Sequence, residues 1–357
     1  MIPVLILAFC CTLCLTLGLV PLLRHYAVIR GLVDKPNARK MHKTAVPRIG
    51  GVGLFISFYS ALLLIYLLYP TFLEPYVYDS RNIFLILGSL VAFGIGLTDD
   101  FKGIRARNKL FFQVVAAGLA YMGGIRIESF GFYDLFSLEL GWLSPFVTIF
   151  WIVLVINAFN LIDGLDGLAG GVGIIACAFL AYICALRGNL VGLVFMTAIS
   201  GGLLGFLRYN FYPASVFMGD GGSYFLGYLL GTISAFLAMT NSATLTTLIP
   251  MLVVTLPIID VTMATLRRFV HGKGIFTPDK QHFHHMLIRR GLSHRNAVIV
   301  LYGIALFISG CALAFLRIKD EKAYVIMLVL GLIPESVMPS VRPPLLCLSV
   351  AIFSLAG

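Results

Sequence analysis

Charged residues are scarce in this sequence, and that scarcity points to the class of protein. Only 12% of the 357 residues are charged, whereas 59% are hydrophobic; soluble domains have about 25% charged residues. This composition disfavours a soluble enzyme. Aromatic residues make up 13% of the chain, which excludes intrinsic disorder. We therefore expect a bundle of membrane-spanning helices. In such a bundle a polar residue is costly, so its presence indicates a structural or functional role.

Ligand-like cysteine spacing is also missing. The seven cysteines all lie in apolar runs, so we interpret them as core or lipid-facing residues without a disulfide or metal role. No basic residue precedes the first apolar run, unlike in a signal peptide, and we expect a retained helix whose N-terminus lies outside.

Ten runs approach the roughly 20 apolar residues that a spanning helix needs. They lie near 2–23, 50–70, 82–98, 109–124, 143–160, 167–186, 189–207, 221–239, 243–266 and 296–316, and a weaker run begins at 323. The sequence thus predicts an all-α polytopic membrane protein with about 10–11 spanning helices. We expect one integral-membrane domain over 1–341 and a short apolar C-terminal tail over 342–357.

Lysine and arginine concentrate in alternate loops. Of the 26 basic residues, 19 follow the first, third, seventh and ninth runs. The positive-inside rule then places the loops after the first, third, fifth, seventh and ninth runs in the cytoplasm, on one face of the membrane. A net charge of +10 fits anionic lipid headgroups and anionic substrates, so no nucleic acid need be invoked.

Two adjacent acids, Asp99 and Asp100, close the third run. Neighbouring carboxylates repel each other, and the negative pole of a helix C-terminus adds to the cost. Either a bound divalent cation or a role as general base would explain the pair.

A second polar string follows the fifth run. Asn157, Asn160 and Asp163 are spaced three residues apart, so they share roughly one face of a continued helix. Asp163 and Asp166 each precede a glycine, which allows tight turns. These oxygen ligands suit Mg²⁺ or a phosphate–metal complex.

A third string, from Phe217 to Ser223, leads into the eighth run. Its glycines, Gly221 and Gly222, let a ligand approach the backbone, and free amides at a helix start suit phosphate. Asp220 beside that phosphate would hold a bridging metal.

Three histidines, His282, His284 and His285, lie in the largest cytoplasmic loop. A zinc site is one interpretation, but no cysteine supports it and the oxygen-rich strings favour Mg²⁺. With Arg268 nearby, the histidines are better suited to bind phosphates. All four strings together indicate phosphate transfer between a soluble nucleotide and a membrane lipid.

Over residues 31–293, these strings resemble the polyprenyl-phosphate N-acetylhexosamine-1-phosphate transferases, glycosyltransferase family 4. The string from His282 to His285 reads His-Phe-His-His and is similar to the WecA/TagO branch. The MraY branch, which makes peptidoglycan lipid I, usually has three consecutive histidines followed by an acid.

The resemblance implies a reaction dependent on Mg²⁺, with Mn²⁺ as a substitute, in the bacterial cytoplasmic membrane. Undecaprenyl phosphate attacks the β-phosphate of a UDP-N-acetylhexosamine, releases UMP and starts a cell-surface polysaccharide. GlcNAc is the first choice of sugar, with GalNAc, FucNAc and QuiNAc as alternatives. A homodimer is compatible with this reading.

The resemblance also suggests residue roles. Asp99, Asp100 and Asp163 are the candidate catalytic residues, and Asp99 is either the base or the acid that faces the lipid phosphate. Asp220 and Asn160 resemble the metal ligands. The candidate substrate-binding residues are Lys109, Asn157, Asp166, Phe217, Arg268, His282, His284 and His285.

Three rival interpretations remain. One is an MraY-like phospho-MurNAc-pentapeptide transferase. A transporter would need ionisable residues near the middle of the membrane and repeated broken helices, which are not apparent here. A CDP-alcohol phosphatidyltransferase shares a faint resemblance around Asp163 and Asp166, but it has further acids that are missing after Gly167.

Overall fold

The computed structural model describes residues 1–34, 45–77, 79–132, 136–239, 248–270 and 283–315. The tail predicted over 342–357, the weak run from 323 and the loop residue His282 lie outside these ranges.

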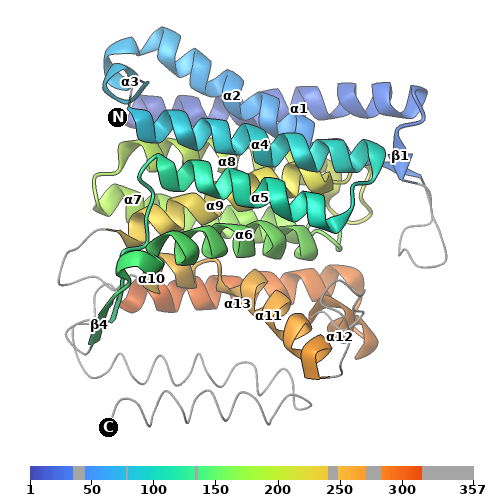
Figure 1. The fold of residues 1–357 in the computed structure, drawn as a ribbon. Coiled ribbons are helices and arrows are strands. Elements are labelled where there is room, and N and C mark those ends of the chain that lie inside the picture. The colour runs from blue at the N-terminus through green and yellow to red at the C-terminus, as the bar shows by residue number, and fades with distance from the viewer. Residues whose placement is uncertain (35–44, 78, 133–135, 240–247, 271–282, 316–357) are drawn as a thin grey trace.

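The protein is a bundle of long helices that lie side by side (Figure 1). The helices are α1 (Ile2–Ile29), α2 (Gly50–Leu68), α3 (Pro70–Val77), α4 (Ser80–Lys102), α5 (Ala106–Met122), α6 (Ser144–Ile162), α7 (Leu168–Leu186), α8 (Leu190–Asn210), α9 (Gly219–Ala238), α10 (Leu248–Leu252), α11 (Thr255–Val270), α12 (Phe283–Arg289) and α13 (His294–Phe315). A 3₁₀ turn, η1 (Gly141–Leu143), precedes α6. Within the described ranges, eight segments are long and apolar enough to cross a membrane: α1, α2, α4, α6 with η1, α7, α8, α9 and α13. The all-α polytopic membrane fold predicted from the sequence is confirmed.

Local capping explains where several helices begin and end. Asp79 precedes α4, and its side chain accepts the backbone N–H of Arg81 at 2.9 Å. α4 ends at Gly103, whose φ of +65° favours glycine. Asn189 caps α8 in the same way as Asp79, by accepting the N–H of Gly192 at 2.9 Å.

Helix α9 lies at the centre of the bundle and packs against α4, α6 and α2. Its side chains are nearly all buried, including Phe225 and Tyr228. Glycines allow close packing here: a Cβ on Gly227 would lie 2.7 Å from the Cα of Ile156 in α6. The residues that begin α9 are therefore held by three neighbouring helices.

The prediction of one helix over 243–266 is wrong for its described part. That part forms two helices, α10 and α11, joined at Val253 and Val254. Pro257 has no amide N–H to donate to the carbonyl of Val253, four residues before it, so a continuous helix is interrupted there. The run predicted at 109–124 forms α5, which begins three residues earlier.

Two short antiparallel hairpins accompany the helices in the part of the chain that the structure describes. β1 (Val33–Asp34) pairs with β2 (Val46–Pro47), and β3 (Ser129–Phe132) pairs with β4 (Phe136–Glu139). Neither hairpin was predicted, because pairs of such short strands leave little hydrophobic pattern in the sequence. The first hairpin follows α1 at the end of the bundle away from the N-terminus (Figure 1).

Candidate active site

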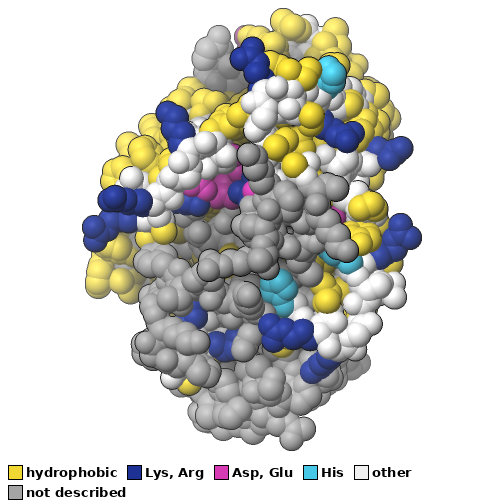
Figure 2. Space-filling view, turned by 90° about the vertical axis from the view of Figure 1, so that its right-hand side faces the viewer, with side chains coloured by type: hydrophobic (Ala, Val, Ile, Leu, Met, Phe, Trp, Pro, Cys, Tyr) yellow, Lys and Arg dark blue, Asp and Glu magenta, His cyan; other side chains and the backbone are white. Residues whose placement is uncertain are grey.

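The predicted polar strings meet at the end of the bundle away from the N-terminus. There α4 and α6 end, and α7 and α9 begin. Figure 2 views this end and shows acidic side chains gathered beside basic ones. The expectation that these strings share one face is therefore confirmed for their described parts.

Lys109 forms the electrostatic centre of this cluster. Its ammonium donates hydrogen bonds to the carboxylate of Asp99 and, at 3.2 Å, to Oδ2 of Asp220. The other oxygen of Asp99 accepts the backbone N–H of Ile104 at 2.5 Å. One cation thus bridges two carboxylates from different helices, and the pair keeps an excess negative charge.

Asp220 is also held by hydrogen bonds from neutral groups. Asn160 in α6 donates to Oδ1 of Asp220 at 3.1 Å and to the Ser223 hydroxyl at 3.1 Å. The Tyr224 hydroxyl donates to Oδ2 of Asp220 at 3.3 Å. Asn160 and Asp220, the two predicted metal ligands, are in direct contact.

Asp100 contacts the backbone of α9. Its Oδ1 accepts the N–H of Asp220 at 2.9 Å, and its Oδ2 accepts the N–H of Gly221 at 3.0 Å. A carboxylate in this position satisfies free amides of the first helical turn and faces the positive pole of the helix. These contacts orient the start of α9, while the catalytic role of Asp100 stays a prediction.

Glycines bring the backbones around Asp220 unusually close. A Cβ on Gly96 in α4 would lie 2.6 Å from the Gly221 nitrogen, and a Cβ on Gly51 in α2 would overlap the backbone of Gly222. Because backbone atoms cannot move aside like a flexible side chain, these positions require glycine.

Phe217 lies at the junction of α9 and the start of α2. Its backbone N–H donates to the Pro47 carbonyl at 2.8 Å, and its carbonyl accepts the N–H of Gly50 at 2.9 Å. The ring is half-buried. Its role in substrate binding stays a prediction.

Asp163 follows the last residue of α6, outside the spanning segments. Desolvation, followed by the negative charges of Asp220 and Asp100, raises the pKa of Asp163 well above its ordinary value, and Arg48 partly offsets this effect. Arg48 itself pairs with Asp34 at 3.0 Å. The site therefore concentrates more negative charge than its nearby cations neutralise.

Two predicted substrate-binding residues have structural contacts. Asp166 accepts the backbone N–H of Ala214 at 2.9 Å, which ties the α6–α7 turn to the segment before α9. Asn157 donates to the Gln113 side chain in α5 at 2.8 Å. Their substrate contacts stay predictions.

The histidine string is described only in part. Arg268 lies in the last turn of α11. His284 and His285 lie at the start of α12, and the side chain of His285 is half-buried. The roles predicted for these residues stay predictions.

Several contact residues were missed by sequence reasoning. Gln113 is a polar residue inside an apolar run, and that anomaly could have identified it. Gln113 also lies four residues after Lys109, on the same helix face. Tyr224 and Arg48 carry no comparable signal, because only the folded chain brings them to the site.

The chemistry of this cluster fits a hard divalent cation. Its donors are carboxylate and amide oxygens, and their negative charge is only partly neutralised. Across the described ranges, no three His, Cys, Asp or Glu side chains are grouped closely enough to hold a metal by themselves. Mg²⁺ is commonly held by one or two carboxylates together with substrate phosphates, so this arrangement suits it.

Comparison with known proteins decides the family. The sequence profile of Glycosyl transferase family 4 matches residues 82–238. The chain is 35% identical to the probable undecaprenyl-phosphate N-acetylglucosaminyl 1-phosphate transferase of Bacillus subtilis over 307 residues, which cover 85% of this chain and 83% of that protein. The chain belongs to glycosyl transferase family 4. This family 4 membership confirms the resemblance inferred from the motifs.

Two other relatives agree with this assignment. The decaprenyl-phosphate N-acetylglucosaminephosphotransferase of Mycobacterium tuberculosis is 30% identical, over 80% of this chain and 76% of the relative. The undecaprenyl-phosphate alpha-N-acetylglucosaminyl 1-phosphate transferase of Salmonella typhi is 28% identical, over 81% of this chain and 78% of the relative. All three names describe the transfer of a sugar phosphate to a polyprenyl phosphate.

Proposed function

We propose that this membrane protein transfers GlcNAc-1-phosphate from UDP-GlcNAc to undecaprenyl phosphate and releases UMP. The observation that carries the proposal is the bridge from Asp99 through Lys109 to Asp220 at the ends of spanning helices. The names of the relatives support this reaction over an MraY-like transferase or a transporter. The product would be the first lipid-linked intermediate of a cell-surface polysaccharide.

The reaction joins two anions, and the site is suited to that problem. An oxygen of the lipid phosphate forms a bond to the β-phosphorus, while the bond from that phosphorus to the oxygen of UMP breaks. The Lys109 ammonium supplies positive charge where the phosphates meet. Asp99 is held in place by Lys109 and Ile104, as a base or a lipid-facing acid requires.

The metal would be held by Asp220 and Asn160, with Mn²⁺ as an alternative to Mg²⁺. When bound, the cation supplies positive charge that lowers the repulsion between the phosphates and the surrounding acids. Lys109 and Tyr224 donate hydrogen bonds to Asp220, and Asn160 donates one to the Ser223 hydroxyl, so the movement of both candidate ligands is limited. Preorganised ligands of this kind suit a nucleotide–metal complex.

The site would face the cytoplasm, in the inner membrane of a bacterium. Support comes from the positive-inside rule and from the basic residues Arg48, Lys109 and Arg268, which lie at the ends of described elements next to the polar strings. A water-soluble nucleotide sugar could enter from that side, while the prenyl chain of the acceptor stays among the apolar helices. A homodimer would be compatible with this arrangement.

The proposal is tested by measuring UMP release from the purified protein in detergent. The assay contains undecaprenyl phosphate, Mg²⁺ and one donor at a time: UDP-GlcNAc, UDP-GalNAc or UDP-MurNAc-pentapeptide. We expect UMP only when UDP-GlcNAc and the lipid are both present. Release only with UDP-MurNAc-pentapeptide would move the protein to the peptidoglycan branch, and no release from a folded protein would contradict the proposal.

A further inference from the structure

Asp260 is a buried acid without a role in the reaction described above. It lies in α11, and only 3% of its surface is exposed. Burying a carboxylate is costly unless hydrogen bonds compensate for the lost water. The contacts of Asp260 therefore show what its burial achieves.

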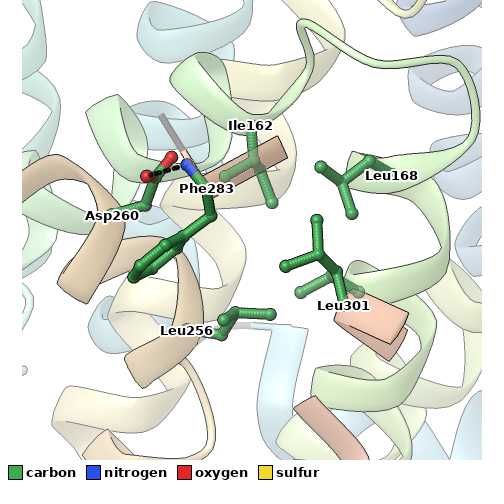
Figure 3. A pocket seen from close by; sticks show the side chains of 7 residues that line it. Ile162, Leu168, Leu256, Asp260, Phe283 and Leu301 are labelled. Atoms are coloured by element: carbon green, nitrogen blue, oxygen red, sulfur yellow. Dashed lines mark hydrogen bonds between the residues drawn. The ribbon is translucent and has the colours of Figure 1, made fainter. Parts of the chain in front are cut away.

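The carboxylate of Asp260 holds the first residue of α12. Its Oδ1 accepts the backbone N–H of Phe283 at 2.9 Å (Figure 3). An acidic side chain at a helix start satisfies an amide that has no partner within the helix. His284 and His285 follow directly in the same helix.

A small, mainly apolar cavity lies between this contact and the facing ends of α6 and α7 (Figure 3). Asp260 and Phe283 line it together with Ile162 from α6 and Leu168 from α7, and Leu301 from α13 also contributes (Figure 3). Ile162 and Leu168 flank the turn that carries Asp163 and Asp166. The start of α12 is thus packed beside the α6–α7 turn.

We propose that Asp260 is a positioning residue that anchors the histidine-bearing helix α12 beside the α6–α7 turn. The inference rests on the proposed function and on the role predicted from the sequence for these histidines, which is to bind substrate phosphates. Asp260 itself does not contact the substrate. It keeps the backbone of α12, and with it His285, at a constant place relative to the acidic cluster.

Three variants and one control test this role. Asp260→Ala removes the hydrogen-bond acceptor, and Asp260→Leu removes it while filling the apolar cavity, so at least one form without the acceptor should fold. Asp260→Asn removes the charge but keeps an oxygen that accepts the N–H of Phe283. The control Ser234→Ala removes another buried polar contact, the 3.0 Å bond from Trp151 to Ser234 in α9.

The first readout is hydrogen exchange over Phe283–Arg289, which does not depend on activity. The second is the KM for UDP-GlcNAc compared with kcat. We expect the forms without the acceptor to exchange faster in α12 and to raise this KM about fivefold, the size of a lost helix cap, with kcat and the KM for undecaprenyl phosphate near wild type. Asp260→Asn and Ser234→Ala should resemble the wild type in both readouts.

Other results would either contradict the anchoring role of Asp260 or separate it from the proposed function. Unchanged exchange and KM in Asp260→Leu would overturn the proposal, and so would an Asp260→Asn variant as defective as Asp260→Leu, because the charge would then matter more than the cap. The same KM increase in Ser234→Ala would reduce Asp260 to a general packing role. If the wild type releases no UMP but Asp260→Leu still loosens α12, the proposed function fails while the anchor stands.

Discussion

Lys109 donates a hydrogen bond of 3.2 Å to Asp220, although 111 residues separate them in the chain. The same ammonium pairs with Asp99, so the first turn of α5 joins the end of α4 to the start of α9. A cation in this position keeps two acids close together that would otherwise repel each other. In the proposed reaction, this cation would lie where the two phosphates approach.

Replacement of Lys109 should therefore reduce turnover strongly. Lys109→Met keeps most of the side-chain length but loses the charge, and we expect a decrease in kcat of about 100-fold, as for other removed electrostatic contacts. UMP release is the measurement. The matched control is Arg107→Met, which removes an exposed cation from the same helix and should retain activity. Equal activity in the two variants would exclude Lys109 from the reaction.

Asp220→Asn should abolish turnover and leave the protein folded. The substitution keeps the size of the side chain but removes the charge that a divalent cation needs. UMP release measured over a range of Mg²⁺ concentrations, with gel filtration as the check on folding, tests this expectation. Wild-type activity, with unchanged dependence on Mg²⁺, would contradict the assignment of Asp220 as a metal ligand.

Gly96 and Gly94 provide a matched pair in α4. A Cβ on Gly96 would overlap with backbone atoms of Asp220 and Gly221, whereas a Cβ on Gly94 would have no heavy atom within 4 Å. We expect Gly96→Ala to lower the free energy of unfolding by about 1–3 kcal/mol and to reduce activity. Gly94→Ala should be neutral or stabilising by up to about 1 kcal/mol. Thermal melting in detergent compares them, and equal melting temperatures would show that α4 and α9 are not tightly packed.

Asp163 should make the stability of the metal-free protein depend on pH. Because its pKa is raised in the folded state, folded Asp163 binds more protons than the unfolded form above about pH 4. Its contribution to stability is therefore lost as pH rises from that value through the raised pKa. Asp163→Asn cannot titrate, so its melting temperature in EDTA should increasingly exceed that of the wild type over this window. A difference that does not change with pH would contradict the prediction.

Much of the fold could be read from the sequence because a bilayer imposes a simple rule on helices. The run predicted at 50–70 forms α2 over Gly50–Leu68. The failure at 243–266 arose because Pro257 interrupts a segment that is apolar on average. Hydrophobic length determines whether a helix can span a membrane, but backbone hydrogen bonding determines whether it is continuous.

The sequence predicted which residues form the candidate site more completely than it predicted how these residues contact one another. The sequence by itself determined which acids and amides are candidates for the site, since polar residues such as Asp99, Asn160 and Asp220 are costly at the ends of apolar helices. Only the tertiary structure decided that Asp100 caps α9 and that Asp260 caps α12. Those contacts join residues far apart in the chain, and their geometry depends on how the helices pack, which no local pattern of residues specifies.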